Sequence, residues 1–323
     1  MTIGSSAKFQ SVGKHNSLHP TCRALLDNSY PDPWEMSLVE ARREFQRHKR
    51  DISGPIPSIR SIETVHAEIN QRQVPITLYR PRVDKALPLA IYIHGGGFVI
   101  GEHDFYHAQC ARVANAVDCI VASVGYGLSP EHRFPQPLED CRLAYNWLLK
   151  EHEWLGIKVD NVAIYGDSAG ANLAAALGVL ATQGVIPAPQ MIWMIYPVTD
   201  MLARTESREK YSKGFGLDES HMRWYRDQYL ADSADAAKIL ASPGRMSGST
   251  AAAFSPTLIQ TAGFDPLKDE ARELAELLYK AEQLLSYTCY EEMTHGFINA
   301  FDLLTESQMA IDEGIRWLRK YIT

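Results

Sequence analysis

The stretch that decides the fold is VAIYGDSAGANLAAALGVL, residues 162–180. It opens on apolar and aromatic residues, turns through Gly166 to Gly170, and continues as a run rich in Ala and Leu. A buried strand, a tight turn and a buried helix are expected in that order. The turn has the pattern G-x-S-x-G, whose glycines let a serine sit on a strained turn with its hydroxyl projecting from the sheet. Ser168 is therefore the candidate nucleophile.

A second motif, HGGGF at residues 94–98, follows the apolar run Leu89–Ile93. A histidine followed by three glycines is rare by chance, whereas G-x-S-x-G alone is not. Glycines let backbone N–H groups approach an oxygen that becomes negative during a reaction. We expect the N–H groups of Gly95, Gly96 and Ala169 to form such an oxyanion hole. A phosphate-binding loop is the alternative, but neither G-x-x-x-x-G-K-[ST] nor G-x-G-x-x-G follows.

A serine hydroxyl needs a base to remove its proton, and an acid orients that base. Along the chain, the expected order is serine, acid, histidine. Two histidines follow Ser168: His295 stands in EEMTHGF directly after the last predicted strand, whereas His221 lies in a helix-like run. Asp265 follows another predicted strand and also fits a helix N-cap before a first-turn proline. His295 is the predicted base and Asp265 the predicted acid, with Asp200 as the alternative acid because it too follows a strand.

Short apolar runs alternate with helical stretches, which is typical of parallel strands joined by helices. The first two runs are joined by residues 70–73 and predict a hairpin, so the sheet is expected to begin antiparallel. We predict an α/β fold with a mixed, mostly parallel eight-stranded sheet flanked by helices. The predicted strands are Thr64–Ile69, Pro75–Tyr79, Leu89–Ile93, Ile120–Val124, Val162–Tyr165, Met191–Tyr196, Leu258–Thr261 and Tyr287–Tyr290.

Two segments do not fit this alternation. Residues 1–55 include an amphipathic helix, and residues 201–250 are too long for an ordinary connection between a strand and a helix. We expect these segments to form a helical cap, while residues 56–200 and 251–323 form the core. The N-terminal helix carries a basic set that is expected to face solvent: Arg42, Arg43, Arg47, Lys49 and Arg50.

Composition excludes several classes of protein. The 323 residues include 32 Lys plus Arg against 39 Asp plus Glu, a net charge of −7, so no nucleic-acid partner is expected. The apolar runs fall short of the roughly 18 residues that span a bilayer, and no secretory h-region is evident, which predicts a cytoplasmic protein that does not enter membranes. Five scattered Cys without C-x-x-C spacing argue against disulfides. His103 and His107 stand four apart without a third ligand, so no metal site is expected.

The motifs HGGGF, GDSAG, DPLKDE and HGF occur in this order around residues 94, 166, 265 and 295. With them, the chain resembles the hormone-sensitive-lipase-like family of α/β-hydrolase carboxylesterases from about Thr64 to its C-terminus. Stretches such as YIHGGGFVIG and LSPEHRFPQPLED are most similar to bacterial acetyl esterases. The resemblance implies an α/β-hydrolase fold, a triad of Ser168, Asp265 and His295, a two-part helical cap and no cofactor.

The implied activity is that of a serine carboxylesterase that hydrolyses short-chain acyl esters of small molecules through an acyl-enzyme. An amidase or formamidase with the same residues, and a non-catalytic ligand-binding protein on the same fold, remain alternatives. A homodimer paired through an edge strand near Tyr287–Tyr290, as in some relatives, is a further expectation. The chain departs from many relatives at Gly125 and Gly127, where an Asp and an Arg are usual, so ion pairing is expected to be lost there.

Overall fold

The structure is a computed structural model that describes residues 8–14, 17–28, 31–69, 72–83 and 85–323. The strands are β1 (Lys8–Val12), β2 (Ser61–Ile69), β3 (Arg72–Arg80), β4 (Leu87–Ile93), β5 (Ile120–Val124), β6 (Ile157–Asp167), β7 (Met191–Ile195), β8 (Thr257–Phe264) and β9 (Leu284–Thr294). The α-helices are α1 (Pro20–Asp27), α2 (Leu38–Ile52), α3 (His107–Val117), α4 (Gln136–Lys150), α5 (His152–Leu155), α6 (Ala169–Thr182), α7 (Glu206–Lys210), α8 (Glu219–Tyr229), α9 (Gly248–Ala252), α10 (Lys268–Lys280) and α11 (Thr305–Ile322). Short 3-10 helices are η1 (Pro33–Glu35), η2 (Ser233–Ala237), η3 (Pro243–Arg245) and η4 (Phe297–Asn299).

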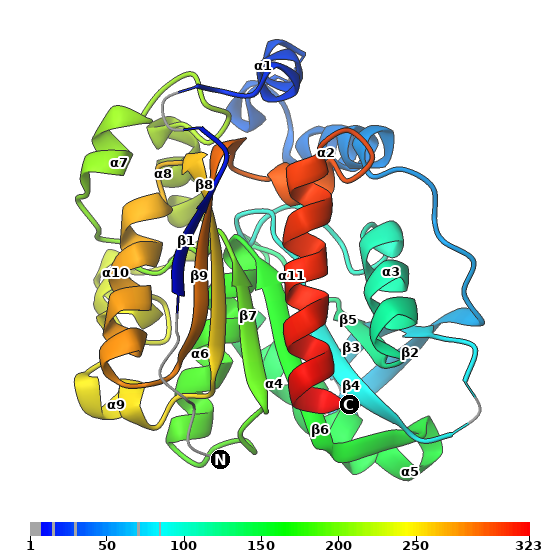
Figure 1. The fold of residues 1–323 in the computed structure, drawn as a ribbon. Coiled ribbons are helices and arrows are strands. Elements are labelled where there is room, and N and C mark those ends of the chain that lie inside the picture. The colour runs from blue at the N-terminus through cyan, green and yellow to red at the C-terminus, as the bar shows by residue number, and fades with distance from the viewer. Residues whose placement is uncertain (1–7, 15–16, 29–30, 70–71, 84) are drawn as a thin grey trace.

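The described residues form one sheet in the order β1-β9-β8-β7-β6-β4-β5-β3-β2 (Figure 1). β2 and β3 are antiparallel, as are β3 and β5, and the remaining neighbours are parallel. This confirms the predicted mixed sheet that begins antiparallel. The turn at residues 70–71 lies outside the described part of the chain.

The sheet contains one strand more than the eight that the sequence predicts. β1 pairs in parallel with β9, from Lys8 opposite Ser286 to Val12 opposite Tyr290. Its sequence, KFQSV, is too short and too polar to stand out as a strand. Because β1 covers β9, the stretch Tyr287–Tyr290 is not the edge of the sheet, and the expectation of an exposed edge there is wrong.

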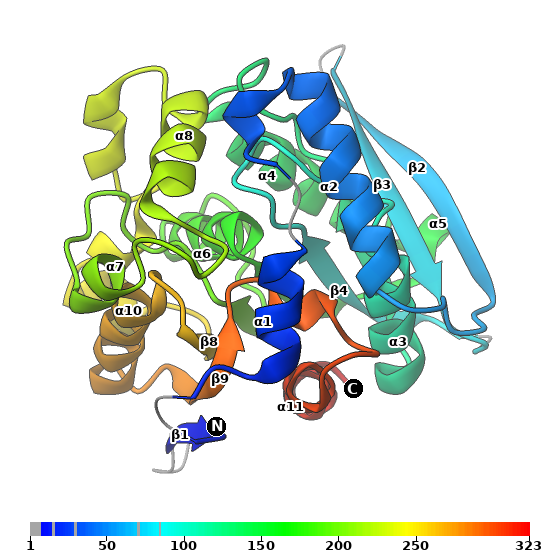
Figure 2. The ribbon, with the colours of Figure 1, turned by 90° about the horizontal axis from the view of Figure 1, so that it is seen from above.

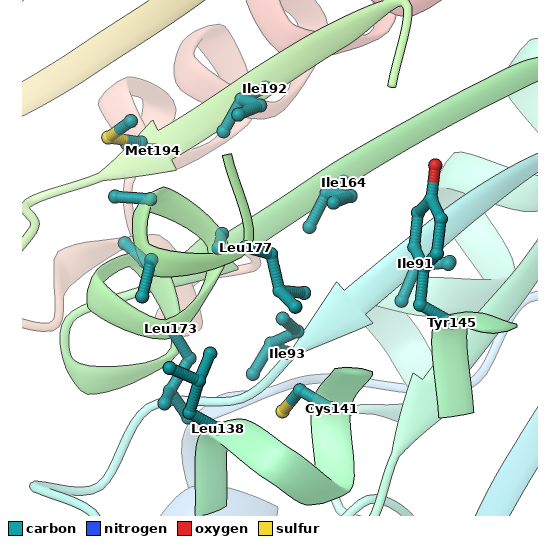
Figure 3. Packing of buried hydrophobic residues seen from close by; sticks show 14 of the residues in the cluster. Ile91, Ile93, Leu138, Cys141, Tyr145, Ile164, Leu173, Leu177, Ile192 and Met194 are labelled. Carbon is teal, nitrogen blue, oxygen red and sulfur yellow. The ribbon is translucent and has the colours of Figure 1, made fainter. Parts of the chain in front are cut away.

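Helices cover both faces of the sheet, and the alternation of strand side chains supplies a core on each side. Ile91 and Ile93 of β4 pack toward α4 and α6, whereas Ala90 and Tyr92 pack toward α3 and α11. Figure 3 shows the first core, where Leu173 and Leu177 of α6 lie against these strands. Residues 169–180 of α6 are all buried, so protein surrounds this mostly apolar helix on every side.

Helices α1, α2, α7 and α8, from the two segments that break the strand–helix alternation, lie beyond the carboxyl ends of the parallel strands, whereas β1 lies in the sheet and α9 lies near the amino end of β8 (Figure 1). Seen from above, α1 and α2 lie on one side and α7 and α8 on the other (Figure 2). The five cysteines are free and buried. Within the described ranges, no helix is long and apolar enough to cross a membrane.

Candidate active site

Ser168 occupies the turn between β6 and α6. Its backbone has φ 55° and ψ −119°, a conformation that is strained for a residue with a side chain. The turn is held because the Ser168 N–H donates a hydrogen bond of 2.9 Å to the carbonyl of Ile195. Gly170 is required here, since a Cβ at this position would lie 2.0 Å from the Ile93 carbonyl oxygen. The sequence therefore places a serine at the carboxyl end of β6, at the N-terminus of a buried helix.

The structure brings Ser168, His295 and Asp265 together. The Ser168 hydroxyl lies 2.9 Å from Nε2 of His295, and Nδ1 of His295 lies 2.7 Å from Oδ2 of Asp265. A carboxylate only accepts hydrogen bonds, so Nδ1 carries the hydrogen and Nε2 is left to accept one from the serine. Asp265 is fully buried, and its Oδ1 accepts a 2.9 Å hydrogen bond from the Leu267 N–H.

The two alternative residues are engaged elsewhere. Oδ2 of Asp200 lies 3.0 Å from the Arg245 guanidinium. His221 lies 3.0 Å from Asp32 through Nε2, and its Nδ1 accepts from the Asp218 N–H at the start of α8. Both side chains join parts of the segment 201–250 to their neighbours, which is a structural role.

His103 and His107 each hydrogen-bond to a hydroxyl group of β3. Nδ1 of His103 lies 2.6 Å from the Thr77 hydroxyl, and Nδ1 of His107 lies 2.9 Å from the Tyr79 hydroxyl. In the described part of the chain, no group of three His, Cys, Asp or Glu side chains is placed to hold a metal ion.

The glycine loop differs from the expectation at one position. The Gly95 N–H donates a 2.8 Å hydrogen bond to Oδ1 of Asp167, so it is not available to a substrate oxygen. The described residues provide no acceptor for the N–H groups of Gly96, Gly97 and Ala169. Gly96 has φ 119°, and a Cβ there would lie 2.0 Å from the Ile100 carbonyl oxygen, so the close turn depends on glycine.

Asp167 is a buried carboxylate that sequence reasoning misses. Besides Gly95, it accepts hydrogen bonds from the hydroxyls of Tyr92 at 2.7 Å and Tyr196 at 3.4 Å. Burial and the nearby carboxylate raise the pKa of both phenols, which keeps them protonated as donors. Asp167 thus ties the glycine loop to the turn that carries Ser168. The sequence signal that could reveal this role is an aspartate inside the glycine-rich turn. A charge buried there needs hydrogen-bond donors from neighbouring segments.

A cavity of about 570 Å³ opens above Ser168 and His295. Its walls include residues of α1, α2 and α8, which come from the two segments outside the core. The lining also includes Phe45, Lys49, Gly96, Gly97, Tyr106 and Asp167.

A family model described as the alpha/beta hydrolase fold matches residues 90–299. This chain belongs to the α/β-hydrolase family. It is 36% identical to the carboxylic ester hydrolase LipN of Mycobacterium tuberculosis, over 95% of this chain and 84% of that protein. It is 34% identical to an ethyl acetate hydrolase of Pseudomonas putida, over 85% and 86% of the two chains.

This chain is also similar to solved structures of ester hydrolases. An ester hydrolase from the metagenome of Lake Arreo, in complex with a bipyridine phosphonate derivative, superposes with a TM-score of 0.88 at 29% identity, covering 94% of this chain and 98% of that one. A hyperthermophilic esterase from Pyrobaculum calidifontis gives a TM-score of 0.86 at 29% identity, with the same coverage. The predicted membership in the hormone-sensitive-lipase-like family is confirmed. This chain is a carboxylic ester hydrolase.

Proposed function

We propose that this carboxylesterase hydrolyses short-chain acyl esters with Ser168 as nucleophile, His295 as general base and Asp265 as the acid that orients it. The observation that carries the proposal is the chain of hydrogen bonds from Ser168 to His295, at 2.9 Å, and on to Asp265, at 2.7 Å. Both distances lie within the range in which a base can take the proton of a nucleophile.

In this mechanism, Nε2 of His295 takes the Ser168 proton while Oγ attacks the ester carbonyl carbon. The resulting imidazolium is stabilised by Asp265 and gives its proton to the departing alkoxide, which leaves as an alcohol. The acyl group remains on Oγ as an ester. A water molecule then loses a proton to Nε2 and attacks this acyl-enzyme, and collapse of the second tetrahedral intermediate releases the acid and returns the proton to Oγ.

The negative oxygen of each tetrahedral intermediate would accept hydrogen bonds from the N–H groups of Gly96, Gly97 and Ala169. This set replaces Gly95, whose N–H is held by Asp167, with its neighbour Gly97. Each such donor contributes about 3 kcal/mol of stabilisation to the transition state.

The preference for short acyl chains is supported by the relative named ethyl acetate hydrolase. The helical parts of residues 1–55 and 201–250 would act as a two-part cap over residues 56–200 and 251–323, whereas β1 (Lys8–Val12) belongs to the sheet of the core. The presence of α1, α2 and α8 residues in the cavity wall supports this division. The substrate would be a small-molecule ester that enters between the two parts of the cap.

Hydrolysis of 4-nitrophenyl acetate, butyrate and octanoate by wild-type protein and Ser168→Ala tests the proposal. We expect the acetate and butyrate to react fastest, and the variant to lose at least about a thousandfold in kcat. Equal rates for the two proteins would overturn the nucleophile, and fastest turnover of octanoate would overturn the chain-length preference. Parallel assays with 4-nitroacetanilide distinguish an amidase, which would prefer the anilide, and turnover of neither compound would indicate a ligand-binding protein.

A further inference from the structure

Lys49 of α2 is a buried cation in the wall of the active-site cavity. Only 7% of its surface is exposed, and it lines the same cavity as Ser168 and His295. Its Nζ lies 5.2 Å from the centre of the Phe45 ring and 5.6 Å from that of Tyr106. The sequence pattern predicts that this residue faces solvent, whereas the structure buries it in the cavity wall.

Among the residues that the structure describes, none places a carboxylate directly beside this ammonium. Across the described ranges, no carboxylate oxygen lies within 4 Å of Nζ, and no hydrogen bond from it is found. Asp167 acts on Lys49 through space, but its oxygens already accept hydrogen bonds from Tyr92, Gly95 and Tyr196. Burial lowers the pKa of Lys49 to about 8, so the amine is still mostly protonated at neutral pH. Aromatic faces offset part of its charge but accept none of its three N–H bonds.

The ammonium lies beside the loop that would hold the reacting oxygen. Nζ faces the ring of Tyr106. The hydroxyl of Tyr106 donates a 3.4 Å hydrogen bond to the Gly95 carbonyl oxygen. Gly95 directly precedes Gly96, one of the proposed oxyanion donors. A substrate bound with its carbonyl at these donors therefore has Lys49 in the same part of the cavity.

We propose that Lys49 is a specificity residue that pairs with a carboxylate carried by the ester substrate, so that the enzyme prefers anionic esters to neutral ones. This inference deepens the proposed function and rests on it. A carboxylate supplies both the negative charge and the acceptor oxygens that the buried ammonium lacks, in a charge-assisted hydrogen bond that is stronger than one to a neutral acceptor. The carboxylate belongs either to the acyl part, as in the half-ester of a dicarboxylic acid, or to the alcohol part, as in an acylated hydroxy acid.

Two matched pairs of substrates distinguish these sources. Monoethyl glutarate against ethyl 5-oxohexanoate places a carboxylate or a methyl ketone at the same point of the acyl chain. Acetoxyacetate against acetoxyacetone does the same on the alcohol side. Hydrolysis is followed by titration of the released acid, and the quantity compared is the ratio of kcat/KM between the charged and the neutral ester of each pair.

We expect wild-type protein to favour the charged ester at least about tenfold in one of the two pairs, since hydrogen bonds to charged groups contribute this much or more. Lys49→Met should bring that ratio close to one through a higher KM for the charged ester, and Lys49→Arg should restore most of it. Arg50→Met is the matched control, because Arg50 is exposed on the same helix and does not line the cavity. This variant should keep the wild-type ratio.

A ratio near or below one for both pairs in wild-type protein would overturn the inference, as would a ratio that Lys49→Met leaves intact. If Lys49 only balanced Asp167, the substitution would lower stability and slow both members of a pair equally, without changing their ratio.

A binding measurement separates this inference from the proposed function. With Ser168→Ala, calorimetric titration of glutarate and of acetoxyacetate should give affinity for one of them that the additional change Lys49→Met removes. If wild-type protein hydrolysed no ester while this binding persisted, the proposed function would fail and the carboxylate site would stand. If wild-type protein hydrolysed esters but showed no Lys49-dependent binding, the carboxylate site would fail and the proposed function would stand.

Discussion

Asp265 makes two hydrogen bonds with different purposes, to Nδ1 of His295 and to the Leu267 N–H at the start of α10. Asp265→Asn keeps the shape of the side chain but removes its charge and favours the wrong imidazole tautomer. We expect kcat for 4-nitrophenyl acetate to fall by about 10³ to 10⁴, while the fold is retained.

Asp200→Asn is the control for this prediction, because Asp200 pairs with Arg245 rather than with a histidine. Its kcat should stay within about twofold of wild type. If Asp200→Asn abolished turnover and Asp265→Asn did not, the roles of the two carboxylates would be exchanged.

His94 begins the glycine loop and is almost wholly buried between aromatic rings. It stacks on Tyr126 with ring centres 4.3 Å apart, and its Nδ1–H donates a 2.8 Å hydrogen bond to the Gly95 carbonyl. Burial lowers the pKa of His94 from 6.5 to about 4. At pH values between about 4 and 6.5, His94 is protonated in the unfolded chain but neutral in the folded chain. The free energy of unfolding should therefore be unaffected by His94 above pH 6.5 and should fall as the pH drops below it.

For His94 alone, this loss amounts to about 2 kcal/mol between pH 7 and pH 5. Urea unfolding of wild-type protein and His94→Gln at both pH values measures it. The variant is expected to be less stable at pH 7 because stacking is lost, but to lose about 2 kcal/mol less than wild type on acidification. The same acid-induced change in both proteins would show that His94 is protonated in the folded state.

At the level of single residues, Ser168, Asp265 and His295 could be selected from the sequence because each stands in a short motif directly after a predicted strand. Parallel strands bring their carboxyl ends to one edge, so residues far apart in sequence meet there. Gly95 could not be assigned in the same way. Whether its N–H faces a substrate or Asp167 depends on the path of the loop, which a run of three glycines does not specify.

At the level of elements, the Arg42 side chain joins α2 to the loops beside the site. Arg42 donates to the carbonyl oxygens of Val99 at 2.9 Å and Ser129 at 3.0 Å, and forms two hydrogen bonds with Glu131 at 2.8 and 2.7 Å. The same helix contributes Phe45 and Lys49 to the cavity. Arg42 thus joins the wall of the cavity to the loops that follow β4 and β5, and it does not lie on a solvated face as expected.

Arg42→Met should loosen α2 without touching the reacting atoms. We expect KM for 4-nitrophenyl butyrate to rise about three- to tenfold while kcat changes less than about twofold, because only the cavity wall is disturbed. Steady-state kinetics give both values. Arg43→Met, which changes a residue of the same helix that does not line the cavity, should resemble wild type. A lower kcat with unchanged KM in Arg42→Met would indicate that α2 acts on the chemistry instead.

The sequence pattern predicts this helix and the exposure of Arg43, Arg47 and Arg50, but it misplaces Arg42 and Lys49. Ala41, Phe45 and Lys49 are spaced four apart and are all buried on one side of α2. That spacing is available as a signal, since residues at i and i+4 share a helix face. The charge of Lys49, in contrast, predicts an exposed position. Its burial depends on the cavity, which is formed by other parts of the chain and cannot be inferred from the sequence of the helix.

The loop after β5 is another element whose contacts the sequence leaves open. Arg72 and Asp140 form a bidentate ion pair at 2.5 and 2.6 Å, and Oδ2 of Asp140 also accepts from the Gly127 N–H at 2.8 Å. A Cβ at Gly127 would lie 2.6 Å from the His132 ring and 2.9 Å from Arg72. Gly127, where many relatives have Arg, therefore lets this loop pack directly against the ion pair between Arg72 and Asp140.

At the scale of the whole molecule, the parallel arrangement of the central strands followed from the alternation of apolar runs and helices, but the outermost strand did not. β1 pairs with a segment about 280 residues away in the chain, and its short, polar sequence carries little strand signal. Its only large aromatic side chain, Phe9, packs against the rings of Tyr279 and Tyr287 at 5.8 and 5.4 Å. The sequence therefore predicted an exposed edge near Tyr287–Tyr290 where the molecule has a covered strand.

Removal of residues 1–13 should expose the hydrogen-bonding edge of β9. Unpaired N–H and C=O groups on a strand of this length are a template for pairing with another chain. We expect the truncated protein to associate with increasing concentration, whereas the full chain keeps a constant mass over the same range, as measured by sedimentation velocity. Phe9→Ala in the full chain retains the β1 backbone and should behave like wild type. If the truncated and full chains sedimented identically at every concentration, covering the edge of β9 would not be what governs self-association.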